Sequence, residues 1–171
     1  MLSCPNCGGN LKFDIPSQQL SCEHCHTLFD PYDFDEKTFT TPYLVCGKYD
    51  DKGITDGVGG NVRMNEPQQG CFVKNEEYTG QKDEYDFYFC DERNHCIRIL
   101  TPTGRVVTFA GRGNDSSDPG FANGALRSEA RFAYPWAIAY DEKRKCFYVG
   151  ERGMSRDGKE QAVIRKIAME E

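Results

Sequence analysis

The sequence predicts a mainly β protein in two parts, a small four-cysteine hairpin followed by an antiparallel β-meander. Two Cys-x-x-Cys pairs lie within the first 25 residues. From residue 67 onward, short runs rich in β-branched and aromatic residues alternate with Gly, Pro, Asn and Asp, as strands joined by turns do. Only one short stretch, 123–132, has a helix-like pattern.

Length and charge exclude several classes of protein. The 171 residues suffice for one or two domains. A net charge of −6 excludes bulk attraction to nucleic acid or to an anionic membrane as the main driving force. No run of eighteen apolar residues is present, so we expect no membrane insertion. The first residues lack the basic and apolar regions of a secretory signal, so we expect a cytoplasmic protein whose nine cysteines are thiols or metal ligands.

The four N-terminal cysteines have the spacing of a zinc site. The pairs Cys4/Cys7 and Cys22/Cys25 are separated by fourteen residues. A two-residue gap lets a tight turn direct two thiolates at one ion, and Zn²⁺ takes four such ligands in a tetrahedron. A closed four-thiolate site has no open coordination position. We therefore predict one structural zinc ion, with neither His24 nor His26 as a ligand.

The residues between the two pairs read as a hairpin. Residues 11–14 and 19–21 alternate as two strands, with Pro16 and Ser17 at the tip. With these strands and the cysteines, residues 1–43, including "CPNCGG" and "LFDPYDF", resemble the zinc ribbons of bacterial proteins related to the TFIIB type. The resemblance implies binding to DNA, RNA or protein. It departs at His26, where the family commonly has glycine after the last cysteine.

Charge favours a protein partner for this ribbon. Residues 1–45 contain two basic and six acidic residues, which gives −4, and a four-thiolate zinc site adds about −2. Such a surface repels phosphate. The aromatic and acidic stretch 29–36 is either a peptide that docks on a protein or an ordinary solvated tail.

Residues 46–66, rich in Gly and Asp, are interpreted as a linker or a long loop. The third part, 67–171, contains seven β-type runs, with 101–104 as a hairpin turn between two of them. These runs are 70–73, 85–90, 96–100, 105–109, 136–140, 146–149 and 162–167.

An internal repeat relates 86–100 to 146–167, and Pro67 precedes its strand much as Pro135 does. The run from Asp91 to Gly111, including Asn94-His95 and Ile97-Arg98, resembles the NHL repeat, whose blades build β-propellers. The resemblance covers about 67–171 and is closest to propellers of envelope-associated proteins from gut bacteria. It implies a propeller-blade-like β-meander of about two blades. The second copy departs, with Glu151 in place of the usual Asp.

Two blades do not close a propeller, which needs about four to eight. Three outcomes remain open. The chain forms a homo-oligomer to complete a ring, folds as an open β assembly covered by 111–125, or is a truncated or chimeric fragment.

Enzymatic activity is not predicted. His95 is the one histidine outside the ribbon, so no multi-histidine site exists, and we expect it to be a structural hydrogen bonder. Cys96 adjoins His95 but points to the opposite face of a strand, so the two form no dyad. Cys90 and Cys96 are expected to be small buried hydrophobes. Asp115 and Asp118 lack a calcium-binding pattern.

The sequence thus predicts a non-enzymatic, acidic, zinc-binding adaptor that binds a protein through the ribbon and the blade edges. The alternatives are a nucleic-acid-associated ribbon protein in transcription or defence, and a truncated envelope propeller that binds a glycan or small ligand. Arg98 and Arg165 are expected to face solvent or to pair with acids between blades. Cys46, Cys71 and Cys146 receive no role. The predicted core aromatics are Tyr85, Phe87, Tyr88, Phe89, Trp136, Phe147 and Tyr148.

Overall fold

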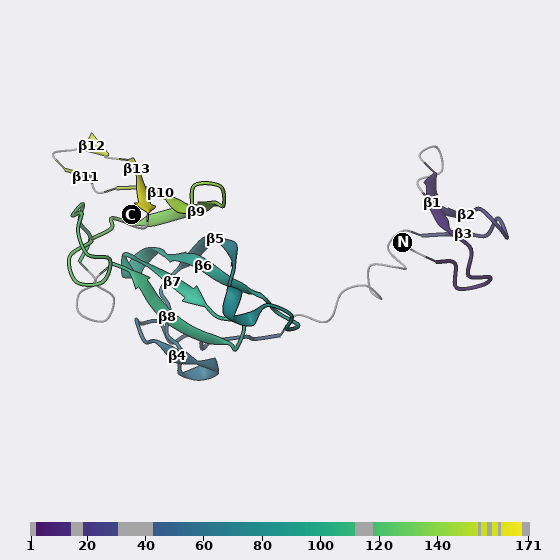
Figure 1. The fold of residues 1–171 in the computed structure, drawn as a ribbon, viewed down its shortest axis with the longest axis horizontal. Coiled ribbons are helices and arrows are strands. Elements are labelled where there is room, and N and C mark those ends of the chain that lie inside the picture. The colour runs from purple at the N-terminus through teal and green to yellow at the C-terminus, as the bar shows by residue number, and fades with distance from the viewer. Residues whose placement is uncertain are drawn as a thin grey trace. The chain divides into compact units, whose positions relative to one another are not determined.

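The fold was analysed in a computed structural model that describes residues 3–14, 19–30, 43–111, 118–153, 155–156, 159–160 and 162–168. Two compact units are present, Met1–Tyr43 and Leu44–Glu171 (Figure 1). All strand pairs are antiparallel, which confirms the mainly β class. Within the described part of the chain, no helix has the length and hydrophobicity to cross a membrane.

The first unit contains a three-stranded sheet of order β1-β2-β3, formed by Leu11–Asp14, Gln19–Cys22 and Leu28–Phe29. The predicted hairpin is confirmed, since Leu11 pairs with Cys22 and Asp14 with Gln19. β3 was not predicted, because two residues are too short to show a period. The proposed hairpin tip at Pro16 and Ser17, and the stretch 31–36, lie outside the described residues.

The second unit contains two larger sheets and a small hairpin. Each of the seven predicted β-type runs overlaps one of its strands. The first sheet has the order β4-β8-β7-β6-β5, with β4 Gly57–Val58, β5 Pro67–Lys74, β6 Tyr85–Asp91, β7 Cys96–Leu100 and β8 Arg105–Ala110. The second sheet has the order β13-β10-β9, with β9 Pro135–Asp141, β10 Cys146–Glu151 and β13 Val163–Ala168. The hairpin pairs β11 Ser155–Arg156 with β12 Lys159–Glu160, and the 3₁₀ turns are η1 Gly59–Asn61, η2 Glu76–Tyr78 and η3 Glu92–Asn94.

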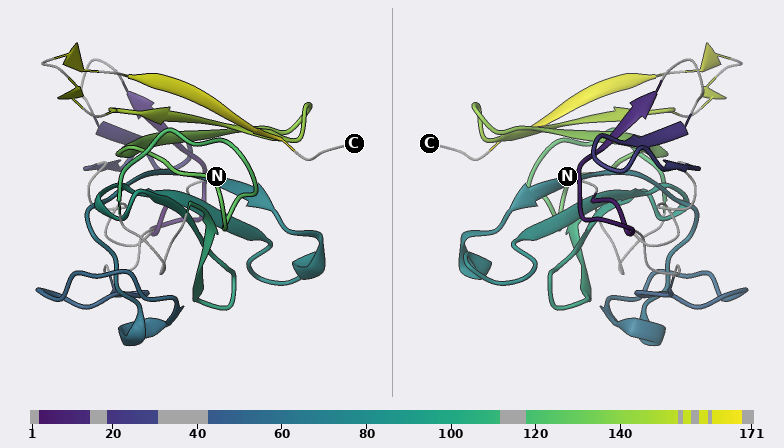
Figure 2. Two further views of the ribbon diagram at one scale, coloured as in Figure 1. Left: turned by 90° about the vertical axis from the view of Figure 1, so that its left-hand side faces the viewer. Right: turned by 90° about the vertical axis from the view of Figure 1, so that its right-hand side faces the viewer.

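The main core lies between these two sheets. Figure 2 shows the second sheet, in green and yellow, as a layer across the first sheet, in teal. Cys90, Ile97 and Ala110 of the first sheet pack against Ile138 and Val149 of the second, and all five are buried. Each sheet thus buries the apolar face that its period-two pattern presents.

Three of the seven predicted core aromatics are not in the core. Tyr85, Trp136 and Tyr148 are exposed, whereas Phe89 and Phe147 are buried. Tyr85 lies at the first residue of its strand, and Tyr148 points to the face of β10 opposite to Phe147. Hydrophobicity alone does not tell which face of a strand will be covered.

Residues 46–66, interpreted from composition as a linker or long loop, belong to the second unit and pack on its first sheet. Val62 is completely buried against Phe89 and Val106. β4 forms one edge of this sheet and pairs with β8 through Gly57 and Val106. The Gly and Asp residues of this segment lie in the turns of a loop that covers the first sheet. Composition alone cannot distinguish such a packed loop from a free linker.

The helix-like stretch 123–132 forms turns and one β-bridge, so the expectation of a helix is wrong. One helical turn closes where the amides of Glu129 and Ala130 both donate to the Ala125 carbonyl. The Glu129 carboxylate accepts from the Ala125 amide. The chain then leaves the turn because Arg131 bridges Ala122 as an extended residue. Helices this short have little stability of their own.

A side chain would not fit at Gly70. A Cβ there would lie 2.6 Å from the Tyr88 carbonyl oxygen and 2.4 Å from the Phe87 ring. The carbonyl belongs to the paired strand and cannot move freely, so we expect Gly70→Ala to lower the unfolding free energy by about 1–3 kcal/mol. Denaturant unfolding measures this. Gly150→Ala is the matched control, because its Cβ would meet nothing closer than 3.8 Å, and an equal loss in both variants would contradict the prediction.

Candidate metal centre and binding surfaces

The four N-terminal cysteines converge on one point. Their sulfur atoms all lie within 4.8 Å of one another, with Cys4 Sγ 3.7 Å from Cys25 Sγ and Cys7 Sγ 3.5 Å from Cys22 Sγ. Sulfurs at the corners of a tetrahedron with Zn–S bonds of about 2.3 Å stand about 3.8 Å apart. The donor set and its spacing therefore fit one tetrahedral Zn²⁺. No other group of three or more candidate ligands is found among the described residues.

The two Cys-x-x-Cys turns have the same backbone geometry. The Gly8 amide donates to the Cys4 carbonyl at 2.8 Å, and the His26 amide donates to the Cys22 carbonyl at 3.1 Å. Each turn then passes through a left-handed residue, Gly8 with φ +74° and His26 with φ +59°. Gly9 follows the first turn, where a Cβ would lie 2.8 Å from the His24 Cβ. The first glycine therefore provides the backbone conformation and the second provides space.

Hydrogen bonds to sulfur favour the thiolate form of Cys22 and Cys25. The Gly9 backbone hydrogen bond acts in the same direction at Cys7, but hydrogen bonds with the other cysteines raise the pKa of that thiol to about 12. The amides of His24 and Cys25 lie 3.4 and 3.5 Å from Cys22 Sγ as donors. The amide of Cys25 is the largest influence that lowers the pKa of the Cys22 thiol. The Thr27 side chain, 3.1 Å from Cys25 Sγ, lowers the pKa of that thiol to about 6. Such donors are typical partners of metal-bound sulfur and orient the ligands.

His26 occupies a backbone conformation that favours glycine. Left-handed geometry costs a non-glycine residue about 1–2 kcal/mol, so His26→Gly should bind one zinc ion with affinity unchanged or moderately tighter. Competition with a chromophoric chelator measures both quantities. His24→Ala serves as the matched control at the neighbouring histidine. Loss of zinc from either variant would show that a histidine is a ligand.

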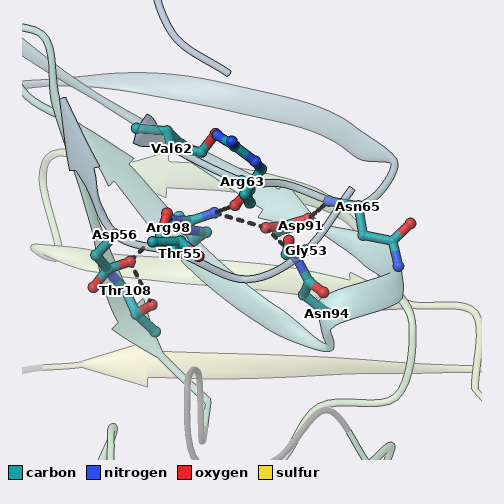
Figure 3. Close-up of polar contacts among 10 residues, drawn as sticks. All are labelled: Gly53, Thr55, Asp56, Val62, Arg63, Asn65, Asp91, Asn94, Arg98 and Thr108. Atoms are coloured by element: carbon teal, nitrogen blue, oxygen red, sulfur yellow. Dashed lines mark hydrogen bonds and ion pairs between the residues drawn. The ribbon is translucent and has the colours of Figure 1, made fainter. Parts of the chain in front are cut away.

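A completely buried arginine organises the second unit (Figure 3). Arg98 Nη1 donates to Asp91 Oδ2 at 3.0 Å and to the Arg63 carbonyl at 2.5 Å. Its Nη2 donates to Asp56 Oδ1 at 2.9 Å and to the Thr55 carbonyl at 2.8 Å. One planar guanidinium thus ties β6 and β7 to the covering segment, which suits arginine and not lysine.

The two acids that face Arg98 are themselves held by other donors. Burial raises the pKa of the Asp91 carboxyl, and hydrogen bonds from Asn94 Nδ2 and the Asn65 amide oppose that rise. Asp56 accepts from the amide and the hydroxyl of Thr108 on β8, both at 3.0 Å. Four of the five N–H groups of Arg98 lie on its two Nη atoms, which bond these acids and two carbonyls, whereas the buried Nε has no hydrogen-bond partner. The arrangement is that of a structural network.

Arg165 forms the same network in the second sheet. Its Nη2 donates to the Ala122 carbonyl at 2.6 Å and to Asn123 Oδ1 at 2.8 Å, and its Nη1 lies 3.5 Å from Glu151 Oε1. Nη1 also donates to the Arg131 carbonyl. Both arginines pair with acids of their own sheet, so the expectation that they face solvent or bridge between blades is wrong.

The repeat extends further upstream than the sequence indicated. Thr55 bridges Arg63 just as Ala122 bridges Arg131. The Asn65 amide donates to Asp91, and the Ala133 amide donates to Glu151. The two segments keep the same residue at Gly53/Gly120, Gly57/Gly124, Arg63/Arg131 and Pro67/Pro135, and most of the other shared contacts use backbone groups. These identities are the sequence signal of the longer repeat, and the last of them, Pro67 and Pro135, begin β5 and β9.

His95 and the two cysteines beside it have structural positions. The Tyr134 amide donates to His95 Nδ1 at 3.2 Å, which is the predicted role of a hydrogen bonder at a strand connection. Burial lowers the pKa of His95, which favours the neutral ring that accepts this bond. Cys90 and Cys96 are completely buried free thiols, as predicted. Burial raises the pKa of Cys90 to about 12, so it is no nucleophile.

A cleft of about 920 Å³ lies at the border of the main core in the second unit. Four rings from both sheets line it, namely Tyr88, Phe109, Tyr140 and Phe147. Phe147 contacts the other three, with centroid distances of 4.6 to 5.5 Å. Polar atoms come from Glu129 and Lys145. Volume and lining are those of a small-molecule site.

Fold and site together define a two-unit β protein with a four-cysteine cluster and a duplicated arginine-centred sheet. Residues 1–30 match the family model described as Trm112p-like protein. The N-terminal segment is therefore Trm112p-like, and the resemblance to TFIIB-type ribbons rests on the sequence motif alone. Among proteins with curated descriptions, none matches the chain at a significant level.

Solved structures from Bacteroides are similar to most of the chain. An auxiliary nutrient binding protein from Bacteroides thetaiotaomicron is 46% identical with a TM-score of 0.64, over 91% of this chain and 31% of that one. One from Bacteroides ovatus is 41% identical with a TM-score of 0.64, over 92% and 32%. A third protein from B. thetaiotaomicron, whose description proposes a phosphatase, is 36% identical with a TM-score of 0.65, over 96% and 35%. The present chain spans about a third of the length of these proteins.

Proposed function

We propose that this chain is a non-enzymatic binding module in which one structural zinc ion holds the four-cysteine unit and that unit contacts a protein partner. The observation that carries the proposal is the convergence of four sulfurs within 4.8 Å on an otherwise small, open sheet. A hairpin of this size buries too little surface to fold without a crosslink or a metal. With all four positions filled by protein, the ion stabilises structure and performs no chemistry.

The unit presents exposed apolar side chains on its two outer strands. Phe13 on β1 and Leu28 on β3 are both about half exposed. β1 and β3 are the outer strands, and so form the two edges, of the described sheet. Such edges accept a strand of another protein through main-chain hydrogen bonds. The acidic charge of residues 1–45 disfavours nucleic acid as that partner.

The test compares proteins captured from native cell extract by the full chain and by a Phe13→Lys/Leu28→Lys double variant. A protein partner should be recovered with the full chain and lost with the double variant and with Cys22→Ser. The captured protein is then purified, and its affinity for each chain is measured by calorimetry. Phe72→Lys, on an exposed strand of the other unit, is the matched control. Equal affinity for the double variant, or recovery of nucleic acid alone, would contradict the proposal.

Absence of catalysis is part of this proposal, although one similar protein has a description that proposes a phosphatase. Outside the four-cysteine cluster, the described residues contain no group of three potential metal ligands. The buried acids Asp91 and Glu151 are engaged by Arg98 and Arg165. These observations favour binding over hydrolysis, and an assay of the full chain with a chromogenic phosphate ester should give no turnover above the rate in buffer without protein. A cytoplasmic location remains part of the same proposal.

A second candidate function is favoured by the aromatic cleft and by the similar proteins named for nutrient binding. Stacked rings with a few polar groups at the rim suit a ligand that has one apolar face, such as a sugar. A thermal-shift screen of mono- and oligosaccharides should identify a stabilising ligand. Tyr140→Ala, in the cleft, should abolish the shift, and Tyr148→Ala, on the opposite face of its sheet, should leave it intact. A shift that persists in Tyr140→Ala would exclude this cleft.

A further inference from the structure

The two sheets of the second unit pack on each other through one interface. Because the sheets are copies of one repeat, each also has, on its outward face, the equivalents of the residues that the other sheet uses in this interface. In the existing interface, Tyr88 and Ile97 of the first sheet meet Phe147 of the second sheet. Ile97 is completely buried there. Through the internal repeat, each of these residues has an equivalent in the other sheet.

The equivalents of Tyr88 and Ile97 lie on the far face of the second sheet. Tyr88 pairs with Cys71 and with Ile99, and Cys90 pairs with Ile97. In the same register, Tyr148 pairs with Ala139 and Lys166, and Gly150 pairs with Ile164. Tyr148, Gly150 and Ile164, with Ala139 and Lys166, form what we call face A. Ile164 is 79% exposed, whereas its equivalent, Ile97, is fully buried.

The equivalents of the second sheet's contact residues lie on the far face of the first sheet. In the second sheet, Phe147 pairs with Tyr140 and Ile167, and these three pack on the first sheet. In the first sheet, Phe87 pairs with Phe72 and Leu100 in the same register. Phe72, Phe87 and Leu100 form what we call face B.

Face B is exposed at its edge strand, β5, whereas Phe87 and Leu100 are partly buried. Phe72 is 68% exposed. Its ring centroid lies 4.9 Å from that of Phe87, which in turn stacks on the buried Phe89 at 5.9 Å. An aromatic cluster that ends in an exposed ring is a typical anchor of a protein interface.

We propose that face A of one copy of this chain packs on face B of a second copy, in the way that the first sheet already packs on the second sheet within each copy. The two faces differ, so this contact is head-to-tail and not two-fold symmetric. A head-to-tail contact produces a closed ring or an open filament. Both faces belong to the second unit, so this contact does not depend on the four-cysteine unit or its partner.

Sedimentation velocity of the full chain over a wide concentration range tests the proposal. We expect concentration-dependent assembly beyond the monomer. Ile164→Lys on face A and Phe72→Lys on face B should each weaken the association constant at least tenfold, because each places a charge in an apolar contact. Both residues are exposed in the single chain, so the melting temperature of the monomer should not change.

Mixing the two variants decides the geometry. The Ile164→Lys chain keeps face B and the Phe72→Lys chain keeps face A, so an equal mixture should form a one-to-one dimer that neither variant forms alone. Leu28→Lys, an exposed apolar residue of the other unit, is the control and should assemble like the unmodified chain. Leu28→Lys also tests the proposed protein-binding surface, so the two proposals fail separately.

Several results would overturn the inference. They are a chain that stays monomeric at every concentration, assembly lost only in Leu28→Lys, or assembly insensitive to both sheet variants. A mixture of the two variants that recovers no dimer would exclude the head-to-tail contact. Sensitivity to Ile164→Lys alone would indicate a symmetric contact between two copies of face A and would equally refute the proposed geometry.

Discussion

Replacing Cys22 with serine is expected to abolish zinc binding and to unfold the four-cysteine unit, while the second unit keeps its structure. Cys22 is the completely buried member of the cluster and receives two backbone hydrogen bonds at its sulfur. Structural zinc contributes about 10–16 kcal/mol of apparent binding free energy in small zinc-held units. Loss of one ligand removes more free energy than a hairpin of this size has from packing.

Two measurements check this expectation. Native mass spectrometry should show one zinc ion per unmodified chain and none per Cys22→Ser chain, and amide NMR signals of the first unit should collapse to random-coil positions. Cys46→Ser is the matched control, since Cys46 is a partly buried thiol of the second unit. Zinc must stay at one ion per chain in that control. Retention of zinc by Cys22→Ser would refute the four-thiolate site.

Replacing Arg98 with methionine is expected to lower the unfolding free energy of the second unit by about 3–5 kcal/mol. The guanidinium is completely buried and bonds two carboxylates and two carbonyls. Removing one partner of a buried ion pair leaves the other charges without compensation, which is the costly case. Lysine should not rescue the loss, because it lacks the planar fork that reaches all four acceptors.

Two other arginine variants provide reference values for the loss of unfolding free energy in Arg98→Met. Arg165→Met should cost less, because the Arg165 side chain is partly exposed and its carboxylate partner lies at 3.5 Å. Arg144→Met, which breaks an exposed i,i+3 pair with Asp141, should leave the unfolding free energy almost unchanged, because exposed ion pairs contribute little. Chemical denaturation, followed by far-ultraviolet circular dichroism, measures all three. If Arg98→Met were as stable as Arg144→Met, the network would have no stabilising role.

Local patterns in the sequence predicted the strands and the candidate metal ligands. The cysteine spacing brought four sulfurs together because both turns are short and close on themselves, and their geometry depends on residues three and four positions apart. The alternating apolar runs predicted β5 to β10 and β13 because strand formation follows a local period of two. Only the very short strands, such as β3 and β4, lacked a period long enough to detect.

The sequence did not predict which faces are covered. Residues 46–66 have the composition of a linker, yet Val62 is buried and Asp56 is tied to Arg98. The same limit explains Arg98, which on charge alone was expected to face solvent or to pair between sheets. Its acids lie 7 and 42 positions away in the chain, and no local period records such a contact.

By itself, then, the sequence determined the mainly β class, the order of the strands along the chain and the four-cysteine donor set, because these depend on residues close together in the chain. Only the tertiary structure decided that Arg98 and Arg165 centre two copies of one network, and that Phe72 and Ile164 remain exposed where their equivalents are covered. The physical reason is that burial depends on which sheet face meets another one. That pairing is set by contacts between distant segments, many of them through backbone groups that every residue shares.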